Sequence, residues 1–417
     1  MRIGWATPFN VRSAIGKFSH VVCQELRTRG HDIEIIRIES GSELKLDAIE
    51  SDFAVIDAAK FTEDEHDILV VNLGNHAPYH ARAVALMAKR TSIGIFHDME
   101  MRDFEWGLLH RHGLTLPRLL GIDPELAGSG LSDMVDREAR AVLAALAAMT
   151  SGAVIHGPHY LETVSAYCPG PVSVIPLCFP DSGSKRAPLP LRAGRRVTIF
   201  GHINDNKQPG RVLEAIALLQ PRLGAIDLHL AGAVDDRRRD ALIAQAKELG
   251  VKKPIFHGYV TDEVLQETIE NSHAVCCLRY PVTEGGSASL VTALYRGRPL
   301  IVSDIASYSM VPDALVHKVS YGESPLDVAE VLMDIFSNQE QADAKALRAQ
   351  EWAKDQFSAA AYVDALDPIL NSDRSHELLV TTARKLTAAI VTRGQEPPLP
   401  SVAAFVSVLD WMEEGRK

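Results

Sequence analysis

The stretch RYPVTEGGSASLVTALYRGRPLIVSD, residues 279–304, carries the most informative pattern of this sequence. Glu284, two glycines and two serines come directly before an apolar run of helical character, which ends at a Gly-Arg-Pro turn. A β-branched strand pattern follows, with Asp304 at its end. A loop with glycines, a helix and a strand in this order are typical of a βαβ unit in a parallel sheet.

The same alternation extends on both sides of this stretch. Before residue 156, strand patterns such as ILVVNL (68–73) alternate with amphipathic helix patterns, and a second series of strands and helices begins at residue 195. Four prolines and two glycines within residues 176–196 indicate a linker between the two series. After about residue 325 the patterns are helical only. We therefore predict an α/β protein with two Rossmann-like parallel-sheet domains.

The predicted domain boundaries follow from these changes of pattern. Residues 1–180 form an N-terminal Rossmann-like domain, 181–195 a linker, 196–365 a C-terminal Rossmann-like domain, and 366–417 additional helices. The last helices have apolar stripes, which favour packing within the chain. Two arrangements stay open for them: packing back on the N-terminal domain, or an interface of a homo-oligomer.

Composition narrows the class of protein. A length of 417 residues with 46% apolar and 23% charged residues is typical of a globular chain of two or three domains. The net charge of −11 argues against nucleic-acid binding, because Lys and Arg are not in excess to displace counterions. The five cysteines lack C-x-x-C spacing, and we expect free thiols. Free thiols suit a reducing cytoplasm, and the sequence shows neither a signal-peptide pattern at its start nor a run of about 18 apolar residues.

Loops that follow strands are the candidate sites, because ligands of such folds bind outside the carboxyl ends of the strands. Glu284-Gly285-Gly286-Ser287 leads into a helix that begins near Ala288. The positive end of a helix suits a diphosphate, and glycines allow a close approach of the backbone. The carboxylate of Glu284 would accept hydrogen bonds from sugar hydroxyls. A glycine-rich turn whose glutamate faces water is the alternative.

A second loop, GHINDNKQPGR (201–211), follows the first strand of the second series. Lys207 precedes a helix there, with His202 and Asn204 near it. A lysine at this place can neutralise a leaving diphosphate. An exposed lysine at the start of a helix is the alternative.

Two further loops belong to the first series. Gly16 lies at the start of the first helix, with Arg12 and Lys17 beside it, and the absence of G-x-G-x-x-G counts against a dehydrogenase. His97 and Asp98 end another strand, where they could orient a hydroxyl or stabilise charge. A structural histidine is the alternative. No metal-ligand spacing occurs near His97, so no protein-bound metal is expected.

Five segments in this order resemble the retaining GT-B-fold glycosyltransferases of family 4, especially the bacterial mannosyltransferase-like and rhamnosyltransferase-like members. The segments are PFNVRSAIGKFS, LGNHAPYH with IGIFHD, FGHINDNK, GYVTDEVL and the stretch at residues 279–304. The likeness extends to roughly residue 365. It implies an acceptor-side N-terminal domain and a donor-side C-terminal domain that face a cleft.

The resemblance also implies the chemistry. A sugar, best guessed as mannose or a related hexose, would move from a nucleotide-diphosphate sugar, with GDP-mannose favoured, to a hydroxyl of a glycan or a lipid-linked acceptor. No cofactor or metal is implied. Family members are cytoplasmic and often contact the inner membrane, while the acidic composition gives no independent indication of such a contact.

Residue roles follow from the matching motifs. Catalytic roles are implied for Glu284, which is the first glutamate of an E-x7-E motif, and for Lys207 and His97. Donor contacts are implied for Gly16, His202, Asn204, Lys207, Tyr259, Val260, Glu284, Gly285, Gly286, Ser287 and Thr292, and acceptor-side contacts for Arg12, His97 and Asp98.

Two departures from the family pattern keep alternatives open. Thr292 replaces the second glutamate of E-x7-E, which usually binds the ribose, and His202 or Asn204 occupies the place of an arginine that accompanies the lysine. A catalytically inactive GT-B scaffold that acts as a binding partner is the first alternative function. A GT-B sugar phosphorylase with pyridoxal phosphate on a lysine is the second.

Overall fold

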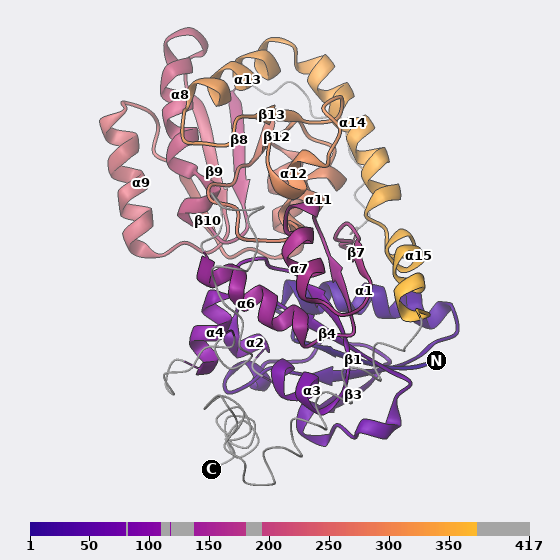
Figure 1. Ribbon diagram of the computed structural model, residues 1–417. Coiled ribbons are helices and arrows are strands. Elements are labelled where there is room, and N and C mark those ends of the chain that lie inside the picture. Colours follow the sequence, from indigo (N-terminus) through magenta and orange to yellow (C-terminus); the bar gives the residue numbers. More distant parts are fainter. Residues whose placement is uncertain (81, 110–116, 118–136, 181–193, 373–417) are drawn as a thin grey trace. The chain divides into compact units, whose positions relative to one another are not determined.

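The computed structural model describes residues 1–80, 82–109, 117, 137–180 and 194–372 (Figure 1). The chain folds into two compact units. Of the described residues, the first unit holds those up to 180 together with 283–286 and 359–372, and the second unit holds 194–282 and 287–358. Most of the predicted linker 181–195 and the predicted helices beyond residue 372 lie outside the described residues.

The first unit contains a seven-stranded parallel sheet in the order β3-β2-β1-β4-β5-β6-β7. Its strands are β1 (Arg2–Thr7), β2 (Asp32–Arg37), β3 (Ala54–Asp57), β4 (Ile68–Leu73), β5 (Ile93–Phe96), β6 (Gly152–Ile155) and β7 (Val172–Val174). All six residues of β4 are buried. A strand that is buried throughout and apolar at all positions except Asn72 is expected where helices cover both faces of a sheet.

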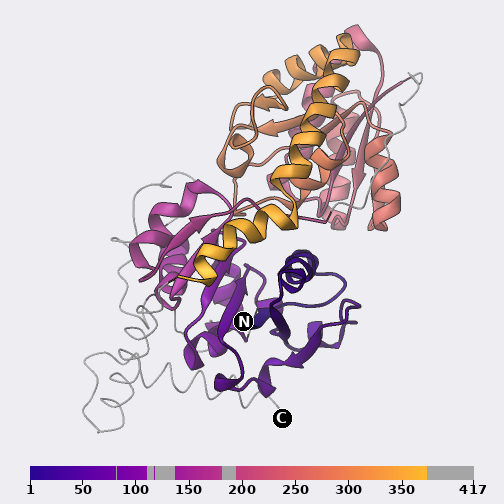
Figure 2. The same ribbon diagram turned by 90° about the vertical axis from the view of Figure 1, so that its right-hand side faces the viewer.

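The helices of the first unit come from both ends of the chain. They are α1 (Ala14–Thr28), α2 (Ala77–His80), α3 (Ala83–Lys89), α4 (Arg102–Leu109), α6 (Arg137–Ala148), α7 (Leu161–Tyr167) and α15 (Ala359–Leu370), with short 3₁₀ turns at η1 (Glu43–Lys45), η2 (Ala58–Lys60), η3 (Glu63–Glu65) and η6 (Pro158–Tyr160). α15 packs against α1 (Figure 2). Arg29, just after α1, donates to the carboxylate of Asp364 at 2.6 Å and to the carbonyl of Ala360 at 3.0 Å.

The second unit contains a six-stranded parallel sheet in the order β10-β9-β8-β11-β12-β13. Its strands are β8 (Arg195–Phe200), β9 (Ile226–Ala231), β10 (Ile255–Gly258), β11 (Ala274–Cys277), β12 (Leu300–Ser303) and β13 (His317–Val319). Its helices are α8 (Pro209–Leu223), α9 (Asp236–Glu248), α10 (Asp262–Glu270), α11 (Ala288–Tyr295), α12 (Ala306–Ser309), α13 (Leu326–Ser337) and α14 (Gln339–Gln356), with a 3₁₀ turn at η7 (Asp205–Lys207). Thr261 caps α10, because its side chain accepts from the N–H of Val264.

Two parallel-sheet, Rossmann-like units confirm the predicted fold class. The core of the second unit joins β8, α8 and α13 through residues such as Val197, Ile216 and Leu332, each at most 1% exposed. This packing fixes α8, and with it the loop between β8 and α8 that carries Lys207.

We expect Leu332→Ala to lower the free energy of unfolding by about 2–5 kcal/mol, because a fully buried leucine leaves a cavity. Leu326 lies on the same helix but is 61% exposed, so Leu326→Ala is the matched control and should change stability by less than about 0.5 kcal/mol. Urea unfolding followed by circular dichroism measures both. Equal losses in the two variants would contradict the assignment of Leu332 to the core.

Candidate functional site

The predicted site residues fall into two groups, one in each unit. Arg12, Gly16, His97, Asp98, Glu284, Gly285 and Gly286 belong to the first unit, and His202, Asn204, Lys207, Tyr259, Val260, Ser287 and Thr292 to the second. Glu284 and Lys207, both predicted to be catalytic, are therefore in different units.

The segment 283–286 is tied to the carboxyl end of β5. The N–H of Gly285 donates to the carbonyl of His97 at 2.9 Å, and the carbonyl of Thr283 accepts from the two N–H groups that follow Asp98. Asp98 and Glu284 thus form an antiparallel bridge flanked by hydrogen bonds. In such a pair the two side chains point to the same face and lie close together.

The two glycines of this segment are required by packing within the first unit. A Cβ atom at Gly285 would lie 2.1 Å from the hydroxyl oxygen of Tyr160, and one at Gly286 would lie 2.8 Å from the Cβ of His156. Tyr160 cannot give way easily, because it is fully buried and its hydroxyl donates to the carbonyl of Phe96 at 2.9 Å. Only a residue without a side chain fits at either position.

The carboxyl group of Asp98 has an unusual proton affinity. Burial raises its pKa to about 7, the nearby charge of Glu284 adds to the rise, and a hydrogen bond from the N–H of Asn75 at 2.8 Å opposes it. A carboxyl with a pKa near neutrality can hold or release a proton at working pH. The Asp98–Glu284 pair therefore combines a hydrogen-bond acceptor with a group able to donate.

The ring of His97 lies in a chain of buried contacts. Its Nε2 is 3.0 Å from the Oδ1 of Asn72, and its Nδ1 is 3.2 Å from the Nε2 of His156. The Nδ1 of His156 is 2.9 Å from the carbonyl oxygen of Ile175. Asn72 donates its amide N–H to the carbonyl of Ala6, and this fixes its Oδ1 toward His97.

This chain of contacts requires more protons than two neutral rings provide. Acceptor oxygens stand at both ends, so three hydrogen bonds need three N–H groups, whereas two neutral imidazoles carry two. Burial lowers the pKa of His156 to about 4 and that of His97 well below its usual value. The pair is therefore neutral at pH 7 and lacks one hydrogen bond. Both ring nitrogens of His97 face protein atoms, and its direct contact with a sugar stays a prediction.

The loop after β6 adds residues that were not predicted. His156, His159 and Tyr160 lie in VIHGPHY, and the Nε2 of His159 is 3.4 Å from the carbonyl oxygen of Glu284. The available signal was positional, because His156 follows β6 as His97 follows β5, and β5 and β6 are neighbours in the sheet.

Arg12 and Gly16 lie around the start of α1. Arg12 is exposed, and the N–H of Gly16 donates to the side chain of Ser13, which caps the helix, at 3.0 Å. A Cβ atom at Gly16 would lie 2.7 Å from the carbonyl oxygen of Pro8. This glycine is therefore required for packing as well.

In the second unit, Lys207 is buried and points back toward the end of β8. Its ammonium donates to the carbonyl of Phe200 at 2.7 Å and to the hydroxyl of Ser289 at 3.4 Å. Gly201 gives it room, because a Cβ there would lie 2.9 Å from Nζ and the backbone has a φ of +85°. Ser289 is in the first turn of α11, so the ammonium lies at the positive end of that helix.

The start of α11 is ordered by its cap. The side chain of Ser287 accepts from the N–H of Leu290 at 3.3 Å, and Thr292 is half-buried in the next turn. A helix N-terminus and an ammonium group beside it are both positive, so an anion placed against them would relieve their repulsion. This arrangement has the chemistry of a phosphate site.

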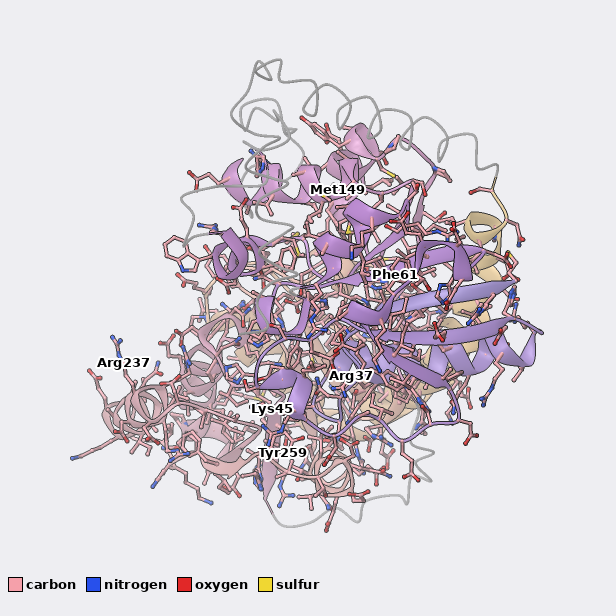
Figure 3. The ribbon with its side chains drawn as sticks, turned by 90° about the horizontal axis from the view of Figure 1, so that it is seen from below. Arg37, Lys45, Phe61, Met149, Arg237 and Tyr259 are labelled. Carbon is pink, nitrogen blue, oxygen red and sulfur yellow. The ribbon has the colours of Figure 1, made fainter. Side chains whose placement is uncertain are left out.

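The remaining predicted donor residues surround the strands β8 and β10. His202 is exposed and Asn204 is half-buried in the loop after β8, and the Oδ1 of Asn204 has no hydrogen-bond partner. Tyr259 is 80% exposed (Figure 3), and Val260 next to it is half-buried. An exposed aromatic ring after β10 is available for stacking.

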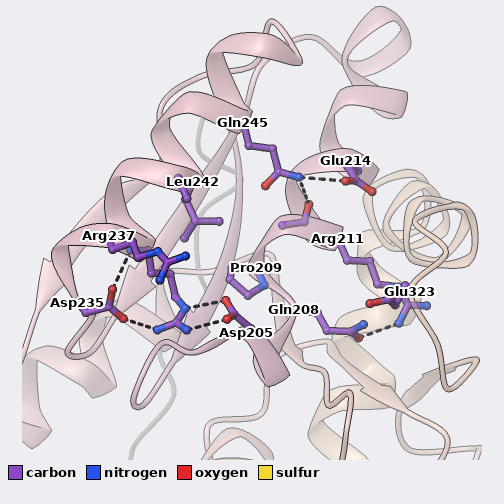
Figure 4. A pocket seen from close by; sticks show the side chains of 13 residues that line it. Asp205, Gln208, Pro209, Arg211, Glu214, Asp235, Arg237, Leu242, Gln245 and Glu323 are labelled. Atoms are coloured by element: carbon purple, nitrogen blue, oxygen red, sulfur yellow. Dashed lines mark hydrogen bonds and ion pairs between the residues drawn. The ribbon is translucent and has the colours of Figure 1, made fainter.

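A pocket of about 890 Å³ lies in the second unit between the N-terminal parts of α8 and α9 (Figure 4). It is lined by Asp205, Gln208, Pro209, Gly210, Arg211, Glu214, Asp235, Arg237, Arg238, Ala241, Leu242, Gln245 and Glu323. Its charges are largely paired: Arg238 binds Asp205 through two hydrogen bonds of 2.7 Å. Lys207 is not among the lining residues, although its neighbours Asp205 and Gln208 are.

Within the described part of the chain, no group of three or more His, Cys, Asp or Glu side chains is placed to hold a metal ion. All five cysteines are buried free thiols, as predicted. Among the described helices, none combines the length and the apolar character needed to cross a bilayer.

Residues 183–354 match the family model described as Glycosyl transferases group 1. No curated protein matches the chain. Among solved structures, a glycosyltransferase from Rickettsia africae ESF-5 is similar, with 14% identity, coverage of 89% of this chain and 99% of that chain, and a TM-score of 0.62.

Two more solved structures are similar. Alr3699/HepE of Anabaena, in complex with UDP and glucose, has 13% identity, coverage of 89% and 100%, and a TM-score of 0.60. WaaG, a glycosyltransferase involved in lipopolysaccharide biosynthesis, has 14% identity, coverage of 89% and 100%, and a TM-score of 0.58. These likenesses confirm the predicted GT-B fold.

The buried histidines predict a loss of stability in acid. Burial lowers the pKa of His80 to about 3 and those of His156 and His159 to about 4. Since an unfolded chain binds these protons near pH 6.5, the free energy of unfolding should fall as the pH drops from 6.5 toward 4. Asp98, with a raised pKa of about 7, acts in the opposite direction but offsets only one proton.

Urea unfolding at several pH values between 7.5 and 5 measures this slope. His156→Gln should reduce the slope by up to about 1.4 kcal/mol per pH unit. His202→Gln, at an exposed site, is the control and should leave the slope as it is. An unchanged slope in His156→Gln would contradict a buried neutral His156.

Gly285→Ala should displace the segment 283–286, because the new Cβ would overlap the hydroxyl of Tyr160. We expect a loss of about 1–3 kcal/mol in stability. The same change made in a Tyr160→Phe background should cost less, since the hydroxyl is absent. Thermal unfolding of the four proteins measures this coupling. An equal cost in both backgrounds would argue against the contact.

Proposed function

We propose that this chain is a retaining glycosyltransferase of the family 4 type, which transfers a hexose from a nucleotide-diphosphate sugar to a hydroxyl of a glycan or lipid-linked acceptor. The observation that carries the proposal is the Lys207 ammonium at the first turn of α11, within the residues that match the Glycosyl transferases group 1 model. The acceptor class rests on the sequence resemblance alone.

Lys207 and the N-terminus of α11 act on the diphosphate. When the bond between the anomeric carbon and the phosphate oxygen breaks, negative charge develops on that oxygen. An ammonium that is already held at 2.7 Å from a backbone carbonyl is preorganised to stabilise this charge. Ser287, Gly285 and Gly286 place backbone along the same group, and His202 and Asn204 border it.

Glu284 and Asp98 act on sugar hydroxyls. Glu284 accepts hydrogen bonds from the donor sugar, and Asp98, whose pKa is near 7, donates a hydrogen bond to the acceptor when it is protonated. His97 holds the segment that carries Glu284 in place, because its carbonyl accepts a hydrogen bond from the N–H of Gly285. Arg12 and Gly16 lie on the acceptor and donor sides, while Tyr259 and Val260 meet the nucleobase.

The reaction proceeds with retention at the anomeric carbon. The acceptor oxygen attacks from the face that the diphosphate leaves, and its proton passes to a departing phosphate oxygen. No protein nucleophile is assigned.

Two donors are candidates. GDP-mannose follows from the sequence resemblance. UDP-sugars deserve equal weight, because solved structures of the similar Alr3699/HepE contain UDP and UDP-glucose. Thr292 stands where the resemblance implies a ribose-binding glutamate, so this position does not favour one nucleotide over the other.

Thermal-shift measurements with GDP-mannose, UDP-glucose, a dTDP-sugar and pyridoxal phosphate test this function. A donor that binds the folded state raises the melting temperature by mass action. Lys207→Met should weaken the shift and lower kcat by about 10²–10³-fold, and Glu284→Gln should also lower activity. Lys247→Met, at an exposed lysine of α9, is the matched control and should retain the shift in melting temperature and the kcat of the unchanged protein.

The other outcomes separate the alternatives. A shift with a nucleotide sugar but no transfer to any acceptor would favour the inactive scaffold for which Thr292 is the indication. A shift and a Schiff-base absorbance with pyridoxal phosphate would favour a phosphorylase. The absence of a shift with all nucleotide sugars would overturn the proposal.

A further inference from the structure

The backbone directly after Lys207 has an unusual conformation. Gln208, between η7 and α8, has φ 53° and ψ 45°, a left-handed conformation that residues other than glycine seldom adopt. Pro209 follows it, and a residue before proline is disfavoured in the right-handed helical conformation. Such a conformation persists only where the surrounding structure imposes it.

The side chain of Gln208 is held at both of its polar atoms. Its Nε2 donates to the carbonyl of Gly322 at 2.7 Å. Its Oε1 accepts from the guanidinium of Arg211 at 2.9 Å, a bond that Figure 4 shows. Gln208 is only 7% exposed. Its side chain is thus fixed to the loop after β13 and to the first turn of α8.

Arg211 connects this glutamine to the loop between β13 and α13. The guanidinium is 5% exposed and donates to the carbonyls of Ser320, Gly322 and Ser324, to the side chain of Gln208 and to the carboxylate of Asp327, at distances of 2.6–3.3 Å. Asp327 also accepts from the N–H of Ser320 at 2.8 Å. One buried cation therefore organises a loop that has no regular structure of its own.

The other end of η7 is held independently. The carboxylate of Asp205 accepts two hydrogen bonds of 2.7 Å from Arg238, on α9. Lys207 lies between these two attachments, one residue before Gln208. Because η7 is held both at Asp205 and at Gln208, the backbone of Lys207 is fixed, and this restricts the direction of its side chain.

We propose that Gln208 and Arg211 are positioning residues for Lys207. They hold the left-handed turn that directs the lysine back to the end of β8, where its ammonium meets the carbonyl of Phe200 and the first turn of α11. The role in catalysis rests on the function proposed above, whereas the positioning itself can be tested without activity.

The activity test uses a double-mutant cycle. Arg211→Met should lower kcat/KM by up to about 100-fold, as expected for a displaced catalytic group. In a Lys207→Met background the same change should have little further effect, because it acts through the lysine. Gln208→Met should resemble Arg211→Met, and Gln208→Gly should retain more activity, since glycine adopts the left-handed turn without the two side-chain bonds.

Arg195→Met is the matched control. This arginine also donates to a backbone carbonyl, that of Leu223, but at the opposite end of β8 and α8. It should leave kcat/KM within a factor of about two, as expected of a variant away from the site. If the loss of kcat/KM in the double variant Lys207→Met/Arg211→Met equalled the product of the two single losses, the proposal would be overturned.

A chemical test needs no substrate. Acetic anhydride labels accessible lysines, and mass spectrometry follows the labelling of Lys207. In the unchanged protein the buried ammonium should react slowly, and in Arg211→Met and Gln208→Met it should react several-fold faster, while Arg195→Met should not differ. Unchanged labelling in both variants would overturn the positioning role, whether or not the chain proves to be a glycosyltransferase. A failure of nucleotide binding with faster labelling would reject only the proposed function.

Discussion

The hydrogen bond from the N–H of Gly285 to the carbonyl of His97 places the glycine-rich loop at residues 283–286 in the first unit. It ties residues 283–286 to the end of β5, although the helix that follows, α11, is part of the other unit. The backbone runs so close to Tyr160 and His156 that no side chain fits at positions 285 and 286. The glycines, first interpreted as room for an anion, therefore serve contacts between protein segments as well.

The sequence predicted most of the fold because the central strands have strong patterns. β4 is buried along its whole length, and all of its residues except Asn72 are apolar. β3, β7 and β13 were not predicted. Each has three or four residues at the edge of its sheet, and β7 has no fully buried residue, so neither a period nor an apolar run can be recognised.

The candidate site was predictable where a single loop carries the signal. Glu284 stands next to two glycines, and Lys207 lies in the loop that begins with Gly201 after β8, so each could be found from its neighbours in the sequence. The proton-deficient contact of His97 with His156 joins residues 59 positions apart, and the bond of Arg211 to Asp327 spans 116. Only the folded chain brings such partners together, so no local pattern indicates them.

Residues 283–286 and 359–372 have a consequence for how the molecule is built. Because both segments belong to the first unit, the chain passes between the units four times, near residues 180, 282, 286 and 358. Neither unit is a single continuous piece of polypeptide. The first unit lacks α15 until the ribosome has synthesised the whole second unit, so it cannot be completed earlier during translation. For the same reason, no single truncation of the chain yields either unit alone.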